Sequence, residues 1–237
     1  MNRSAFDPPP VAVVFDPPPL AVVFDKDGTL LDFERTWSLS VLAAIDAAAY
    51  SPADADAAAV ALGIDRSTGR FATDSLFLVG PNDACDDVTR DHLDLVRYRN
   101  VLGDESSVRA ATLEGAVELL EALTTAGVPL AVMTNDSEAA ARAQLGALDL
   151  LPHFRTVLGF DSGFGGKPDR APLLAAADRL GVAPSRCLMV GDTGHDIHAG
   201  VAAGMATALI SPDGDDLGLP ATVVVRRPDE LITLLDL

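Results

Sequence analysis

Short apolar runs alternate with amphipathic segments through the second half of the chain. Each run is short enough to be one buried strand, and the runs lie at 128–133, 156–159, 187–190, 207–210 and 222–225. Other segments space their apolar residues as a helix does, at 113–125, 137–145, 171–180, 196–203 and 229–235. Strands that alternate with helices form parallel sheets with helices on both faces. The pattern therefore predicts an α/β fold built on a doubly wound parallel sheet.

The first half of the chain has a different pattern of apolar residues. Residues 20–25 form one more apolar run, which we expect to be the first strand of the same sheet. After it, apolar residues recur at helical spacing and predict three helices, at 36–49, 51–62 and 86–99. Residues 64–85 contain glycines and no clear period, which predicts irregular structure.

These segments divide the chain into three parts. Residues 1–19 repeat Phe-Asp pairs followed by prolines. A proline-rich segment cannot join a central strand ladder, so we predict an N-terminal extension there. Residues 33–109 lack the pattern of a buried strand and predict an α-helical cap domain. The parallel sheet is expected from 20–32 and 110–237, with the cap inserted over its ligand crevice.

Two carboxylates follow the first predicted strand, in the sequence Phe-Asp-Lys-Asp-Gly-Thr-Leu at 24–30. Residues two apart in a strand face the same side, so we expect Asp25 and Asp27 to converge on one small volume. Two like charges held together are costly unless a cation or a proton offsets them. The pair therefore indicates a metal and acid–base chemistry. Lys26, between them, is expected from the alternation of a strand to point away from both, and to have a structural role or to support the site residues from behind rather than take part in catalysis.

Polar residues also follow the other predicted central strands. They are Thr134 and Asn135 after the run 128–133, Lys167 in a Gly-Gly-Lys-Pro loop, and Asp192 and Asp196 after the run 187–190. The carboxyl ends of parallel strands meet at one edge of a sheet, where ligands bind. We therefore expect these side chains to lie near the aspartate pair.

The order of these residues resembles the haloacid dehalogenase superfamily, in particular its phosphatases with a helical cap inserted after the first motif. The four motifs of that superfamily are Asp-x-Asp-Gly-Thr, an apolar strand ending in Thr or Ser, Lys-Pro, and Gly-Asp-x-x-x-Asp. All four occur here in that order. Members of the phosphoglycolate-phosphatase type are the most similar. The resemblance covers about residues 20–237 and implies a Rossmann-like core that carries out phosphoryl chemistry.

The resemblance also implies roles for individual residues. Asp25 would be the nucleophile that forms an aspartyl phosphate. Asp27 would be the acid for the leaving oxygen and then the base for the hydrolytic water. Thr134 and the Asn135 backbone would bind phosphoryl oxygens, and Lys167 would neutralise charge that develops on the phosphoryl group.

A hard divalent cation is implied as well, and Mg²⁺ is the expected one. Its ligands would be the carboxylates of Asp25 and Asp192 and the backbone carbonyl of Asp27, because oxygen ligands suit this ion. Asp196 would be a further ligand, or would orient the others from outside the metal's own shell.

Charge and composition limit the partners. The net charge is −18 with no basic cluster, which argues against nucleic acid and anionic membranes. The same charge repels an anionic substrate, so the site must supply its own cations. No apolar run is long enough to cross a membrane, and the N-terminus lacks a signal-peptide pattern. With only two cysteines, we expect a reduced, cytoplasmic protein.

The predicted cap contains no lysine. Members of the resembled superfamily that cleave phosphonates, and its sugar-phosphate mutases, use a cap lysine, so both activities are disfavoured. Dehalogenases lack the second aspartate, which is present here as Asp27. The leading hypothesis is therefore Mg²⁺-dependent hydrolysis of a small phosphorylated metabolite, with 2-phosphoglycolate as one candidate. The cap's candidates for contacts to the substrate are Arg66, Arg70, Arg90, Arg97 and Arg99.

Two alternatives remain open. A pyrophosphatase or a nucleotidase would use the same chemistry on another substrate. A non-catalytic protein that binds a phosphorylated ligand would share the fold, although the intact Asp25, Asp27, Lys167 and Asp192 argue against it.

Overall fold

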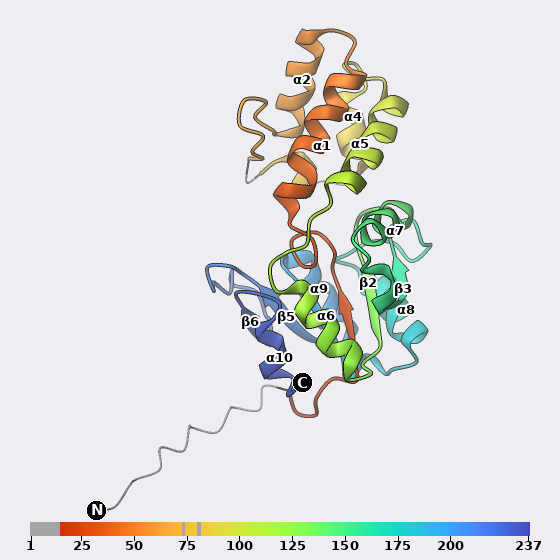
Figure 1. The fold of residues 1–237 in the computed structure, drawn as a ribbon, viewed down its shortest axis with the longest axis vertical. Helices are drawn as coiled ribbons and strands as arrows, with labels where there is room; N and C mark the ends of the chain where they lie inside the picture. Colours follow the sequence, from red (N-terminus) through yellow and green to blue (C-terminus); the bar gives the residue numbers. More distant parts are fainter. Residues whose placement is uncertain (1–14, 73, 80–81) are drawn as a thin grey trace, which may run out of the picture.

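The computed structural model describes residues 15–72, 74–79 and 82–237. Figure 1 shows a sheet with helices packed against it and a group of helices that stands off one end of the sheet. The chain enters this group at α1 (Phe33–Ala48) and leaves it at α5 (Leu95–Arg109). We refer to helices α1 to α5 as the helical unit.

The sheet has six strands, all parallel. They are β1 (Ala21–Phe24), β2 (Leu130–Met133), β3 (Phe154–Leu158), β4 (Cys187–Gly191), β5 (Ala206–Ile210) and β6 (Val223–Val225). Their spatial order is β3-β2-β1-β4-β5-β6, which confirms the predicted parallel sheet. The chain order reverses at β1, between β2 and β4. In sheets of this type the ligand crevice lies at the carboxyl ends of the strands, at this reversal point.

Both faces of the sheet are buried. In β1, Val22 and Phe24 belong to one hydrophobic core, whereas Ala21 and Val23 belong to another. The first core is covered by α6 (Ala116–Thr125), α7 (Glu138–Ala147) and α10 (Glu230–Leu234), and the second by α8 (Ala171–Leu180) and α9 (Gly194–Ala203). Burial on both faces explains why the strands are apolar without alternation. Each buried Val or Phe contributes about 1.5–3 kcal/mol to this packing.

The helical unit has a core of its own. Besides α1 and α5 it contains α2 (Pro52–Leu62), α3 (Leu76–Val79) and α4 (Asn82–Thr89). Its buried residues come mainly from one face of α1 and from the alanine-rich face of α2. Side chains cap the first turns of three helices, since Asp32, Ser51 and Asp94 accept hydrogen bonds from backbone N–H groups of α1, α2 and α5.

The predicted helix at 86–99 is wrong. The structure ends α4 at Thr89 and begins α5 at Leu95. Asp94 interrupts the helix because its carboxylate accepts hydrogen bonds from the N–H groups of Val96 and Arg97, which makes it an N-cap. The segment 64–85 also contains α3 and the start of α4, so it is less irregular than predicted.

The N-terminal segment touches the core where the structure describes it. Residues 1–14 of the predicted extension lie outside the described residues. Phe15 is buried in the first core, and Arg186 donates a hydrogen bond from Nη2 to the Pro18 carbonyl at 2.9 Å. Short 3-10 turns at Leu151–His153 and Pro184–Arg186 lead into β3 and β4. Among the described residues, none of the helices has both the length and the apolar character needed to cross a membrane.

Candidate active site

The loop after β1 turns sharply at the edge of the sheet. Asp25 extends the pairing of β1, since its N–H donates to the Val190 carbonyl at 2.8 Å. The chain then folds back, and the Lys26 carbonyl accepts hydrogen bonds from the N–H groups of Leu30 and Leu31 at 2.8 and 2.9 Å. Gly28 has a φ of +79°, a conformation that glycine adopts most readily. The turn leaves the Asp25 side chain at the carboxyl end of the central strand.

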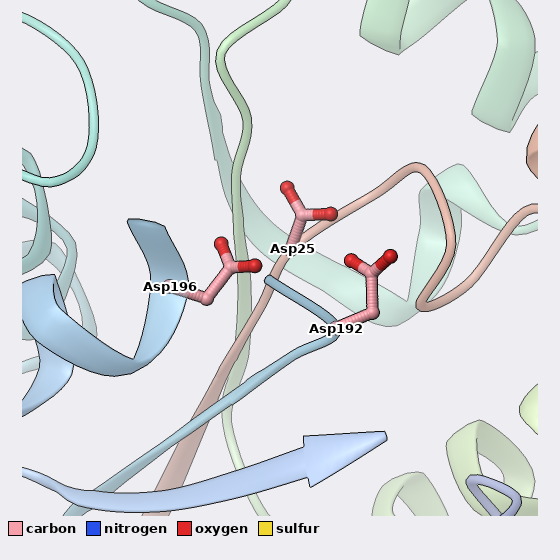
Figure 2. A group of neighbouring side chains, drawn as sticks. All are labelled: Asp25, Asp192 and Asp196. Carbon is pink, nitrogen blue, oxygen red and sulfur yellow. The ribbon is translucent and has the colours of Figure 1, made fainter. Parts of the chain in front are cut away.

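Three carboxylates meet at this edge. Asp25 follows β1, Asp192 follows β4, and Asp196 lies in the first turn of α9. Each offers an oxygen, and these oxygens lie within 4.8 Å of one another. Figure 2 shows the three side chains pointing toward a common space from these separate elements. We refer to Asp25, Asp192 and Asp196 as the carboxylate cluster.

The Asp192 carboxylate fits against the turn because residue 28 has no side chain. A Cβ atom at Gly28 would lie 2.1 Å from Asp192 Oδ2 and 2.6 Å from its Cγ, which is closer than such atoms approach. The hydroxyl of Thr29 lies 3.4 Å from Asp192 Oδ1 and donates to it. The glycine of the first motif therefore makes room for the carboxylate of the fourth.

Lys167 links two members of the carboxylate cluster. Its ammonium donates to Asp25 Oδ1 and, at 2.6 Å, to Asp196 Oδ1. The other oxygen of Asp196 accepts from the N–H and the hydroxyl of Thr193, at 3.0 and 2.6 Å. Asp196 is therefore held on both sides, and it holds Lys167 beside Asp25. The predicted convergence of Asp25, Lys167, Asp192 and Asp196 is observed in the structure.

Asn135 and Thr134 lie at the end of the neighbouring strand β2. The Asn135 side chain pairs with the main chain of Lys167, accepting from its N–H at 2.8 Å and donating to its carbonyl at 2.9 Å. The sequence predicted a role only for the Asn135 backbone. No local pattern indicates that the Asn135 side chain pairs with the main chain of Lys167 in another loop. Thr134 is buried, and its hydroxyl accepts from the Asp136 N–H at 3.1 Å. The roles predicted for these two residues on phosphate stay predictions.

The electrostatics of the site favour a bound cation. Burial, together with the charges of Asp196 and Asp27, raises the pKa of Asp25 to about 7, against the lowering effect of Lys167. Burial, with the charges of Asp25 and Asp196, also raises the pKa of Asp192 well above its usual range. The pKa of Lys167 is raised because the two carboxylates outweigh its burial. One ammonium does not balance three carboxylates, so a further positive charge would stabilise their ionised forms.

The Asp27 carboxylate takes a direction that the sequence did not predict. Asp27 is not part of the carboxylate cluster, and its oxygens accept from Lys26 Nζ at 2.5 Å and from Trp37 Nε1 at 2.7 Å. The expectation that Lys26 points away from its neighbour is wrong. Strand β1 ends at Phe24, so the alternation of a strand no longer applies to the residues that follow. Trp37, in α1, was missed because only the tertiary fold brings it to this loop.

The arginines of the helical unit differ in their surroundings. Three of the five predicted candidates pair with carboxylates of the unit itself: Arg66 with Asp46 and Asp56, Arg90 with Asp87, and Arg99 with Asp86. Arg70 lines an open surface groove together with Ile64 and Phe71. Their predicted contact with a substrate stays a prediction.

Comparisons with known proteins agree with this arrangement. A family model described as haloacid dehalogenase-like hydrolase matches residues 19–204. A phosphoglycolate phosphatase of Rhodospirillum rubrum is 38% identical over 133 residues, which cover 56% of this chain and 55% of that protein. An N-acetylmuramic acid 6-phosphate phosphatase of Pseudomonas aeruginosa is 35% identical over 138 residues, which cover 56% of this chain and 61% of that protein. The chain thus spans less than two thirds of the length of these curated relatives.

A solved structure is similar over nearly the whole chain. The crystal structure of a HAD family hydrolase from Deinococcus radiodurans, with bound phosphate and sodium, superposes with a TM-score of 0.64 at 25% sequence identity. The match covers 92% of this chain and 96% of that one. The likeness therefore extends to the helical unit as well as to the sheet.

Proposed function

Because this chain belongs to the haloacid dehalogenase-like hydrolase family, we propose that it is a phosphatase that hydrolyses phosphomonoesters of small metabolites. The observation that carries this proposal is the pairing of buried Asp25 with Lys167 at the carboxyl end of the central strand. A carboxylate beside a fixed cation is suited to attack a phosphoryl group, because the cation offsets charge on the transferred oxygens.

The proposed reaction has two steps. An Asp25 oxygen attacks phosphorus, the bond between phosphorus and the leaving oxygen breaks, and Asp27 gives its proton to that oxygen. A water molecule then attacks the aspartyl phosphate, gives a proton to Asp27 and releases inorganic phosphate with Asp25 restored. Lys167 stays beside Asp25 through both steps, and Thr134 and the Asn135 backbone N–H bind phosphoryl oxygens.

The carboxylate cluster fits a hard cation, and we propose Mg²⁺ as the resident ion. The donors are all oxygens, as this ion prefers, and Gly28 leaves space for the Asp192 carboxylate. Asp25 and Asp192 would hold the ion together with the Asp27 main-chain carbonyl, with Asp196 as a further ligand or as the group that orients them. When bound, the ion would offset negative charge on the phosphoryl oxygens.

The first candidate substrate is 2-phosphoglycolate, on the strength of the Rhodospirillum rubrum relative. The Pseudomonas aeruginosa relative acts, by its name, on a larger phosphorylated sugar acid, so a sugar phosphate is the second class to assay. A cytoplasmic location suits such metabolites, and both cysteines, Cys85 and Cys187, are buried.

The test is release of inorganic phosphate by the purified protein, with and without Mg²⁺. The substrates are 4-nitrophenyl phosphate and a panel that includes 2-phosphoglycolate, sugar phosphates, nucleotides and pyrophosphate. We expect Mg²⁺-dependent release that Asp25→Asn abolishes. If wild type and Asp25→Asn release phosphate equally, or neither does so with any substrate, the protein is not a phosphatase of this kind.

A further inference from the structure

Lys26 is fully buried in the loop that carries the two aspartates of the first motif. Its ammonium contacts three side-chain oxygens: Asp27 Oδ2 at 2.5 Å, Gln144 Oε1 at 2.5 Å and Asp136 Oδ2 at 3.3 Å. The first two contacts are hydrogen bonds, whereas Asp136 Oδ2 forms an ion pair with the ammonium and accepts no hydrogen bond from the described residues. Burying a lysine costs several kcal/mol unless such partners surround it. The fold supplies them from the catalytic loop, from the loop after β2 and from α7.

Both oxygens of the Asp27 carboxylate are held by different donors. Lys26 binds Oδ2, and the indole Nε1 of Trp37 donates to Oδ1 at 2.7 Å. The Lys26 ammonium also lies over the Trp37 ring, 5.2 Å from its centroid, where a cation is attracted by the ring face. The three side chains therefore form a closed group that fixes the rotation of the Asp27 carboxylate.

This group is connected to α5 by a second route. Gln144, on α7, accepts from Lys26 and donates from Nε2 to the Ser106 hydroxyl at 3.0 Å. Gln144 and Ser106 are both fully buried, so water does not replace these contacts. The helical unit thus reaches Asp27 through Trp37 of α1 and through Ser106 of α5. These two helices are also the ones through which the chain enters and leaves the unit (Figure 1).

We propose that Lys26 and Trp37 are positioning residues that hold the Asp27 carboxyl for proton transfer to the leaving oxygen. We further propose that the contact between Gln144 and Ser106 ties this position to the placement of the helical unit. The proposal rests on the phosphatase function proposed above. Its consequence is that a shift of α1 or α5 away from the sheet would release the orientation of Asp27.

The first test compares two leaving groups. 4-Nitrophenolate departs without help from an acid, whereas an alkyl oxygen needs a proton. For Lys26→Met and Trp37→Phe we expect kcat/KM to fall by about 100-fold with an alkyl phosphate, the scale of a lost general acid. With 4-nitrophenyl phosphate the kcat/KM of the same variants should fall by less than tenfold. A residue with a purely structural role would lower both values by the same factor, and that result would overturn the proposal.

The second test does not depend on activity. Trp37 is the chain's one tryptophan, so fluorescence emission reports directly on the group around Asp27. We expect Lys26→Met to shift the emission maximum, and Ser106→Ala to shift it by a smaller amount. The matched control is Lys167→Met, which removes the chain's other lysine from its contacts with Asp25 and Asp196 and should leave the emission unchanged.

The two tests separate the two proposals. A wild-type protein that releases no phosphate from any substrate overturns the phosphatase function and the proton-transfer role with it, even if the emission shifts as expected. If the wild-type protein is active, but its variants lose kcat/KM by the same factor with both substrates and keep the same emission maximum, the positioning role alone is overturned. If Lys26→Met does not fold, Trp37→Phe carries the substrate comparison and Ser106→Ala carries the emission measurement.

Discussion

Replacing Gly28 by alanine tests how the loop after β1 and the Asp192 carboxylate fit together. The new Cβ would lie 2.1 Å from Asp192 Oδ2, and a real contact of this kind is at least 3.0 Å. The carboxylate must therefore retreat by about 1 Å, and a displacement of that size in a catalytic group costs on the order of 100-fold in rate. Alanine at a φ of +79° also costs about 1–2 kcal/mol of stability.

Gly127→Ala is the matched control for this change. Gly127 has a φ of +74°, so alanine meets the same backbone strain there, but its Cβ has no neighbour within 4 Å. Both variants should lose about 1–2 kcal/mol in urea unfolding with EDTA present. Only Gly28→Ala should lose about 100-fold in kcat/KM and need more Mg²⁺ for half-maximal rate. Equal kcat/KM values for the two variants would refute the fit between Gly28 and Asp192.

Three other changes have expected outcomes. In the metal-free protein the pKa of Asp25 is raised to about 7, and the pKa of Asp192 is raised as well. Ionising these carboxyl groups therefore costs folding free energy, for Asp25 as the pH rises from about 4 to 7. In urea unfolding, the free energy of unfolding of Asp192→Asn should exceed that of wild type by more at pH 8 than at pH 5. Mg²⁺ at 100 times its Kd should add about 2.7 kcal/mol to wild type but not to Asp192→Asn, measured by the same unfolding. Asn135→Ala should lower kcat about tenfold, because the Lys167 main chain loses two hydrogen bonds that hold it in place. Circular dichroism should show that the variant is still folded, and an unchanged kcat would contradict the prediction.

The sheet and its polar edge could be predicted because both depend on local pattern. Strands such as β2 and β4 are short apolar runs, and parallel pairing brings their carboxyl ends together whatever the loops do. The meeting of Asp25 and Asp192 could therefore be predicted without knowing any side-chain contact. The sequence pattern is less informative in the helical unit, where the single hydrogen-bonding side chain of Asp94 ends one helix and starts another.

The direction of Asp27 could not be predicted for a different reason. Its partner Trp37 lies in a helix beyond the turn, and the contact exists only because α1 returns over the loop after β1. Gln144 reaches Lys26 from a helix that follows β2, far along the chain. Periodicity describes which face of an element is buried, but it does not say which polar atom on another element will meet it.

The two lysines of the chain explain how the site accommodates so many carboxylates. Lys167 pairs with Asp25 and Asp196, and Lys26 pairs with Asp27 and Asp136. Among the described residues, Asp192 has no ion pair, and it is also a carboxylate whose pKa is raised well above the usual range. Two ammonium groups against these five carboxylates leave three uncompensated negative charges when all are ionised, and a divalent cation beside Asp192 would leave one. The ionisation that makes the metal-free protein less stable is therefore the source of its expected affinity for Mg²⁺.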